Sequence, residues 1–230
     1  MKKIEALTFD LFGTVLNLDD SLNPFIESFI SDSQIDTTPS QFWKTYRHRQ
    51  RIEQYQDNIL MLGHSGYTQV AENAFVYTAK IYGCDPSKNQ IEGMMTGWKN
   101  LNPFPEVLES LLHLSKKFKL VALSNGEHNF LKHLATERIK FDFDNIISVE
   151  TVGEFKPSPL VYRKASEILG IPPDRLLMVS ANSFDVLGAV SSGFWGAYID
   201  RYSLPFESSP HQPHLICNNF IDLNNQLENI

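Results

Sequence analysis

The sequence has only two cysteines in 230 residues, Cys84 and Cys217. They form neither a disulfide framework nor a pattern of metal ligands. We therefore expect two free thiols in a reducing compartment, which makes the cytoplasm the expected location.

Long apolar runs and positive charge are also scarce. No apolar stretch approaches the roughly 20 residues that a membrane-spanning helix needs. Near the start of the chain, Glu5 interrupts the apolar stretch and no small-residue cleavage site follows, so we do not expect a signal peptide. The formal net charge of −7 disfavours a broad surface for nucleic acid or for an anionic membrane. We expect neither kind of partner.

What remains is the composition of a globular protein, 42% hydrophobic and 20% charged. Short apolar runs, each ending at a polar or glycine-containing turn, predict buried strands of a parallel sheet. Helical spacing lies between several of these runs, and Ser158-Pro159 is typical of a helix start. The alternation predicts a doubly wound α/β core. The predicted strands are 4–9, 119–123, 146–149, 176–179 and 197–199.

Residues 19–98 have a helical pattern without clear strands. Thr38-Pro39-Ser40-Gln41 has the layout of a capping box, with a proline in the first turn of the helix that follows. We therefore predict an all-helical cap over 19–98, inserted into a discontinuous core of 1–18 and 99–230.

Four polar segments follow predicted strands. Ligands of open α/β sheets bind beyond the carboxyl ends of the strands, so these segments are candidates for a site. Asp10 stands three residues before Gly13, and the backbone N–H groups of such a turn can stabilise negative charge. Ser124-Asn125-Gly126 offers small hydrogen-bonding groups before a helix N-terminus. Equally, Asp10 could cap its turn and the second segment could be an ordinary turn.

The other two segments contain Lys156 and Asp185. Lys156 lies in a loop between an aromatic residue and a proline, where it can pair with a carboxylate or a substrate anion. Asp185 follows Ser180 and Asn182 and falls in the first turn of a predicted helix, where the helix dipole favours a carboxylate. The alternatives are a solvated surface lysine and a well-capped helix start.

The order D-x-x-G-T, S-N-G, K-P and S-x-N-x-x-D resembles the haloacid dehalogenase superfamily, and most closely its L-2-haloacid dehalogenase branch. This resemblance implies a Rossmann-like core with a cap. It also implies hydrolysis of a short 2-haloacid to the 2-hydroxy acid, with a halide ion as product. The reaction would use a covalent aspartyl ester and neither cofactor nor metal, and the chain could form a homodimer.

Phe12 favours carbon–halogen cleavage over phosphate hydrolysis. Phosphatases of the superfamily have a second, proton-donating Asp at this position, and phenylalanine cannot donate a proton. They also use acids to hold Mg²⁺ where this chain has the neutral Ser180 and Asn182. A halide leaves without a proton, so both differences fit a dehalogenase.

Carried over by position, the resemblance makes Asp10 the nucleophile, oriented by Thr14 and Lys156. Asp185, Ser180, Asn182 and Lys156 would position or activate the water that attacks the ester. The residues implied in substrate binding are Leu11 and Phe12 through their N–H groups, Ser124, Asn125, Phe184, the supporting Tyr162, and Arg47 in the cap.

Arg47 is implied by Tyr46-Arg47-His48-Arg49-Gln50, which resembles an aromatic-Arg-x-x-Gln segment that supplies the halide-binding cation. Arg49 is the second choice, and a solvated basic face of Arg47, Arg49 and Arg51 is the simpler alternative.

Three positions depart from the family, which usually has Tyr for Phe12, Gln for His48 and Trp for Phe184. We therefore expect the preferred substrate to differ, and we expect His48 to be a surface or core histidine. Two other functions stay open: a metal-dependent phosphatase or phosphonate hydrolase, and a binding protein without turnover.

Overall fold

The computed structural model describes residues 4–228. The chain divides into two compact units, which we call the core unit (Met1–Leu16 and Pro103–Ile230) and the cap unit (Asn17–Asn102). The boundaries predicted at 19 and 98 differ by a few residues. Asn17 belongs to the cap unit because it caps the first cap helix by accepting a hydrogen bond from Asp20 N. Asn102 belongs there because its N–H donates to Ser21 Oγ.

The core unit contains a six-stranded parallel sheet in the order β5-β4-β1-β6-β7-β8. Each of the five predicted apolar runs forms one of its strands, and the predicted doubly wound α/β fold is confirmed. β8 was not predicted; its residues are apolar, but the strand is only three residues long and its Ile216 is exposed. The strands are β1 (Ala6–Phe9), β4 (Lys119–Ser124), β5 (Asn145–Ser148), β6 (Leu176–Ser180), β7 (Trp195–Ile199) and β8 (Leu215–Cys217).

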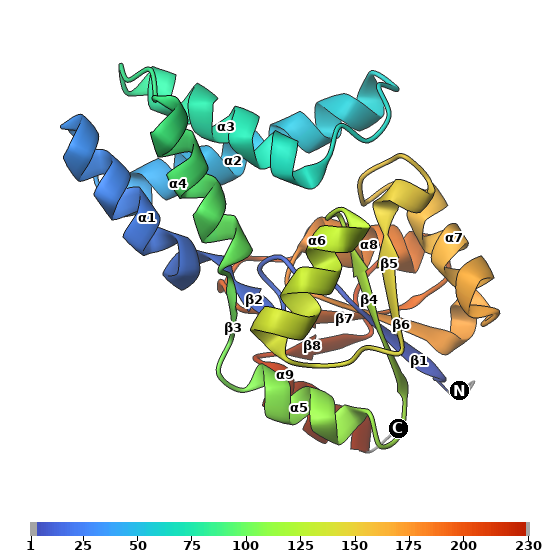
Figure 1. The fold of residues 1–230 in the computed structure, drawn as a ribbon. Coiled ribbons are helices and arrows are strands. Elements are labelled where there is room, and N and C mark those ends of the chain that lie inside the picture. Colours follow the sequence, from blue (N-terminus) through green and yellow to red (C-terminus); the bar gives the residue numbers. More distant parts are fainter. Residues whose placement is uncertain (1–3, 229–230) are drawn as a thin grey trace. The chain divides into compact units, whose positions relative to one another are not determined.

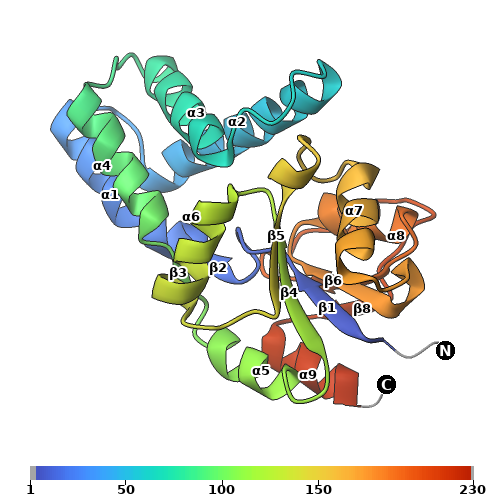
Figure 2. The same ribbon diagram turned by 45° about the vertical axis from the view of Figure 1, so that its right-hand side comes forward.

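Helices cover both faces of this sheet (Figures 1 and 2). One face carries α5 (Val107–Leu114), α6 (His128–His133) and α9 (Phe220–Glu228), and the other carries α7 (Pro159–Leu169) and α8 (Ser183–Ser191). Because both faces are covered, all four residues of β1 are buried. Ser158 caps α7 as predicted. Short turns of other helix types complete the unit: η1 (Leu134–Ile139), η2 (Val149–Thr151) and η3 (Pro173–Arg175).

The cap unit consists of four helices among the described residues: α1 (Leu18–Ser33), α2 (Pro39–Ile59), α3 (Tyr67–Ile81) and α4 (Lys88–Lys99). The predicted capping box at Thr38 and Gln41 is confirmed. Aromatic rings fill the interior, and Tyr46 links three helices because its hydroxyl donates to Ala71 O and accepts from Trp98 Nε1.

The chain passes between the units at two short strands, β2 (Leu16–Asn17) and β3 (Asn102–Pro103). None of the helices described here is long and apolar enough to cross a membrane.

Candidate active site

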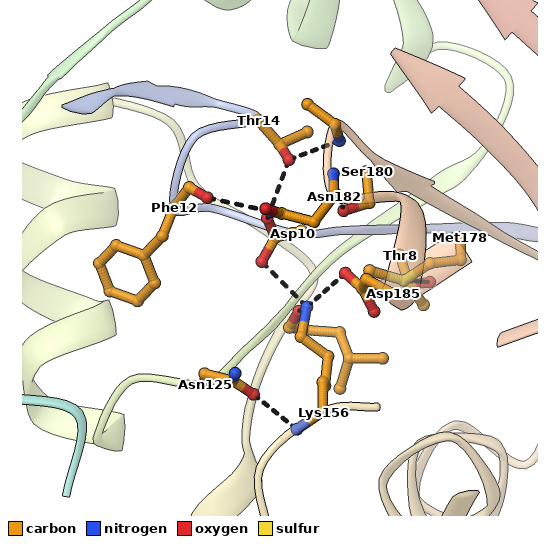
Figure 3. Close-up of polar contacts among 12 residues, drawn as sticks. Thr8, Asp10, Phe12, Thr14, Asn125, Lys156, Met178, Ser180, Asn182 and Asp185 are labelled. Carbon is orange, nitrogen blue, oxygen red and sulfur yellow. Dashed lines mark hydrogen bonds and ion pairs between the residues drawn. The ribbon is translucent and has the colours of Figure 1, made fainter. Parts of the chain in front are cut away.

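Asp10 follows the last residue of β1, between the ends of β4 and β6. Its side chain is buried, and its carboxylate accepts hydrogen bonds from three side chains (Figure 3). Thr14 Oγ1 and Asn182 Nδ2 each lie 2.8 Å from Oδ2, and Lys156 Nζ lies 2.9 Å from Oδ1. The carboxylate thus connects three of the four predicted segments. An aspartate that only capped its own turn would not contact the other segments.

Lys156 is 1% exposed, so the alternative of a solvated surface lysine is wrong. Its ammonium donates to Asp10 Oδ1, to Asp185 Oδ2 at 2.7 Å and to Leu123 O at 2.9 Å. These contacts use all three ammonium protons. Burial lowers the pKa of Lys156, but the charges of Asp10 and Asp185 more than offset this, so the pKa lies above its usual value.

Asp185 lies in the first turn of α8, as predicted, and is fully buried. Burial raises the pKa of Asp185, although Lys156 and a hydrogen bond from Tyr162 oppose the shift. The Tyr162 hydroxyl lies 2.7 Å from Asp185 Oδ1. Tyr162 therefore holds the Asp185 carboxylate in place. Glycine at position 188 leaves room for the Tyr162 hydroxyl, because a Cβ there would lie only 2.8 Å from it.

The two oxygens of Asp10 differ in their hydrogen bonds. Oδ2 accepts from two donors, Thr14 and Asn182, whereas Oδ1 accepts only from Lys156 among the described residues. A carboxylate oxygen has about two lone-pair sites, so Oδ1 keeps one available. The site thus combines a fixed carboxylate that has one unused lone pair with a second acid, Asp185, on the same lysine.

Three small polar residues at the strand ends differ in their hydrogen bonding. Ser180 Oγ accepts from Asn182 N at 3.1 Å, and Asn125 Oδ1 accepts from Lys156 N at 2.8 Å. Ser124 is fully buried, but its Oγ has no hydrogen-bond partner among the described residues. A buried hydroxyl without a partner costs free energy, which makes Ser124 a candidate for contact with a polar ligand.

The turn after Asp10 places Leu11 and Phe12 in the interior, at 0% and 2% exposure. Leu11 O accepts the backbone N–H groups of three later residues, 14 to 16. The Phe12 ring points away from the Asp10 carboxylate (Figure 3). It stacks on Phe130, with ring centroids 5.9 Å apart. Phe184 is half-buried in the first turn of α8.

In the cap unit, Arg47 and Arg49 have different surroundings. Arg49 pairs with Glu53 at 2.6 Å and lies over the Tyr77 ring, 4.0 Å from its centroid. Arg47 Nη1 lies 2.5 Å from Gln50 Oε1 and 3.4 Å from the Tyr67 hydroxyl. His48 is exposed. Both arginines are half-buried, so they do not form the simple solvated face that the charge pattern allowed.

Arg201 and Tyr202 also contact the turn after Asp10 and were not predicted. Arg201 Nε donates to Thr14 O at 3.1 Å, and the Tyr202 hydroxyl donates to Gly13 O at 3.2 Å. A signal existed, because both residues follow closely after a predicted strand, as the four recognised segments do. Within residues 4–228, no three His, Cys, Asp or Glu side chains are grouped to hold a metal ion.

Known proteins resemble this chain in sequence and in fold. The family model described as haloacid dehalogenase-like hydrolase matches residues 4–193. (S)-2-haloacid dehalogenase H-109 of Pseudomonas putida is 29% identical over 90% of each chain. Haloacetate dehalogenase H-2 of Moraxella sp. (strain B) is 27% identical over 93% of each chain. The fold matches a structure of L-2-haloacid dehalogenase from Xanthobacter autotrophicus with chloropropionic acid covalently bound, with a TM-score of 0.84 and 23% identity over 99% of each chain. The chain therefore belongs to the haloacid dehalogenase-like hydrolases.

Proposed function

We propose that this hydrolase converts short 2-haloalkanoic acids into 2-hydroxy acids through a covalent ester on Asp10, without a metal ion. The observation that carries the proposal is the Asp10 carboxylate, held by three side chains and with one lone pair of Oδ1 unused by the described residues. The names of the two relatives, a 2-haloacid and a haloacetate dehalogenase, support the choice of substrate class.

In the first step, Asp10 Oδ1 attacks C2 of the substrate opposite the halogen. The new C–O bond forms while the carbon–halogen bond breaks, and its electron pair leaves with the halide. The attack inverts C2. A halide needs no proton to leave, so Phe12 can stand where a phosphatase needs an acid.

In the second step, water attacks the carbonyl carbon of the Asp10 ester. Asp185 accepts the proton of this water, because its raised pKa makes it a stronger base than an ordinary aspartate. Negative charge then develops on Oδ2, where Thr14 and Asn182 already donate. The ester C–O bond breaks and Asp185 returns the proton to the departing oxygen, so the hydroxy acid leaves with the former Oδ1. The water oxygen stays on Asp10, which releases the second proton of the water to solvent and becomes a carboxylate again. Ser180 holds Asn182 in place, and Tyr162 holds Asp185.

We assign binding of the substrate carboxylate to Ser124, Asn125 and the N–H groups of Leu11 and Phe12. The Ser124 hydroxyl has no hydrogen-bond partner in the described part of the chain. Phe184 would line the pocket beside the alkyl group. We assign halide binding to Arg47, because Glu53 already neutralises Arg49.

A direct test measures chloride release from L-2-chloropropionate and chloroacetate in the presence of a chelator. We expect chloride release and D-lactate from the chloropropionate, because one inversion occurs. No chloride from any short haloacid would overturn the proposal, and magnesium-stimulated hydrolysis of a simple phosphoester would favour a phosphatase instead.

Asp185→Asn tests the ester itself. We expect about one chloride per protein, after which turnover stops and mass spectrometry finds the acid attached to the peptide that contains Asp10. A single turnover of the unmodified chain in heavy-oxygen water should place the label in Asp10. An unlabelled Asp10 after turnover would contradict the covalent path.

The proposal extends to a cytoplasmic homodimer. Both cysteines are free thiols, as a reducing compartment permits. Ile59, Leu60, Met61 and Leu62 are 62–91% exposed and form an apolar stretch that a second copy could cover. Analytical ultracentrifugation tests the dimer, and a monomer at micromolar concentration would contradict it.

A further inference from the structure

Three successive carbonyl groups after Asp10 each accept a hydrogen bond from a distant side chain. Asn182 Nδ2 donates to Phe12 O, the Tyr202 hydroxyl to Gly13 O and Arg201 Nε to Thr14 O, at 3.1–3.2 Å. Gly13 has a φ of +86°, a conformation that other residues rarely adopt. The turn thus relies on side chains from β6–α8 and from the segment after β7 to hold its shape.

Arg201 is itself held by several groups of the core unit. Its side chain is 7% exposed, and Nη1 lies 2.7 Å from Glu106 Oε1. The guanidinium lies 3.7 Å from the ring centroid of Phe104 and 5.3 Å from that of Phe220. A buried cation between two rings and a carboxylate has little freedom to move, so its Nε is a fixed point for Thr14 O.

The hydrogen bond from Arg201 to Thr14 is connected to Asp10, the proposed nucleophile, through the Thr14 hydroxyl. Thr14 Oγ1 accepts from Ala181 N at 2.8 Å, so its own proton points to Asp10 Oδ2, also at 2.8 Å. If the backbone of Thr14 shifts, both hydrogen bonds of its hydroxyl change. The Asp10 carboxylate then turns relative to Lys156 and to the substrate carbon.

We infer that Arg201, anchored by Glu106, is a positioning residue that sets the attack angle of Asp10 by holding the carbonyl of Thr14. This inference rests on the proposed function, because it concerns the ester-forming step. Arg201 acts through Thr14 and contacts no reacting atom, so its loss slows attack while substrate binding stays nearly the same. Misplacement of a reacting group by about 1 Å can lower a rate about 100-fold.

Arg201→Met tests the inference, and Arg175→Met is the matched control. Arg175 also pairs with a glutamate, Glu5 at 2.5 Å, but at the opposite end of β1. With the Asp185→Asn change present in both, the rate of ester accumulation on Asp10 measures the first step alone. We expect Arg201→Met to slow it about 10–100-fold at saturating haloacid, with less than about a threefold change in the half-saturating concentration. Equal rates in the two variants would overturn the inference.

A double-mutant cycle separates positioning from general damage to the fold. If Arg201 acts through the Thr14 hydroxyl, Arg201→Met costs much less in a Thr14→Val chain, where that hydroxyl is missing. Multiplicative losses would overturn the inference. Glu106→Gln is the gentler variant should Arg201→Met fold poorly. It keeps an acceptor but loses the charge, so we expect the same slowing to a smaller degree, and an unchanged rate would count against the anchor.

The unmodified chain, assayed alongside, distinguishes the two possible failures. If it releases no halide, the proposed function fails whatever Arg201 does. The carbonyl ¹³C resonance of Thr14 then still reports the hydrogen bond. Arg201→Met should shift it and Arg175→Met should not, whereas an unshifted resonance would remove the structural basis of the inference.

Discussion

The ammonium of Lys156 lies 2.9 Å from Asp10 Oδ1, although the two residues are 146 positions apart in the chain. The same ammonium lies 2.7 Å from Asp185 Oδ2. One buried cation therefore holds both the proposed nucleophile and the proposed base. This links the stability of the core unit to its chemistry, because loss of the cation would leave two buried carboxylates facing each other.

Lys156→Met should therefore reduce both stability and activity. Removing one partner of a buried ion pair costs about 3–5 kcal/mol, and losing a donor beside the reacting group costs about 10²–10³ in kcat. Lys164→Met is the control, because Lys164 forms an exposed pair with Glu167 at 3.1 Å, whose loss should change stability by no more than about 0.5 kcal/mol. Urea unfolding and halide release measure both effects. Equal stability of the two variants would contradict this account of Lys156.

The raised pKa of Asp185 predicts how activity depends on pH. Asp185 must be ionised to accept a proton, so kcat should fall on the acid side at a pH above the usual aspartate range. The Tyr162 hydrogen bond lowers this pKa, so Tyr162→Phe should raise it further and move the acid limb to higher pH. Tyr77→Phe, at a half-exposed tyrosine of the cap unit, should leave the limb in place. A limb that moves to lower pH in Tyr162→Phe would exclude Asp185 as the titrating base.

The unpartnered hydroxyl of Ser124 predicts opposite effects on stability and on binding. Ser124→Ala removes a buried donor that no described group satisfies, so stability should stay the same or rise by about 1 kcal/mol. KM for the haloacid should rise, because the substrate carboxylate loses its partner. Ser148→Ala is the matched control, since Ser148 Oγ donates to Gly126 O at 2.7 Å and its loss should destabilise the chain by about 1 kcal/mol. An unchanged KM in Ser124→Ala would remove Ser124 from the binding site.

The fold could be predicted from the sequence because buried parallel strands are short apolar runs, and five of these are present. β8, an edge strand of three apolar residues, was not predicted. Convergence of the four polar segments followed from one rule, that the carboxyl ends of parallel strands share an edge.

The individual hydrogen bonds and side-chain contacts could not be predicted from the sequence. Ser124 and Ser180 both end strands and are alike in sequence, yet only Ser180 finds a partner in the described residues. Arg201 is similar: its role depends on Phe104, Glu106 and Phe220, which come together only in the folded core unit.

The contacts of Arg47 and Arg49 predict which arginine serves the halide. Two positions apart on α2, the side chains point to different sides of the helix. Arg49 is occupied by Glu53 and Tyr77, so Arg49→Met should cost about 0.5–1 kcal/mol of stability and little activity. Arg47→Met should lower the rate about 10²–10³-fold, the loss typical of one charge-stabilising donor.

The leaving group gives this comparison a second measurement. Chloride is a poorer leaving group than bromide and depends more on a cation to stabilise its developing charge. The factor by which Arg47→Met lowers the rate should therefore be larger for 2-chloropropionate than for 2-bromopropionate. Arg49→Met should change the two rates by the same factor. If Arg49→Met instead loses activity selectively with 2-chloropropionate, Arg49 is the cation that binds the halide. The spacing to Gln50, which favoured Arg47, would then have indicated the wrong arginine.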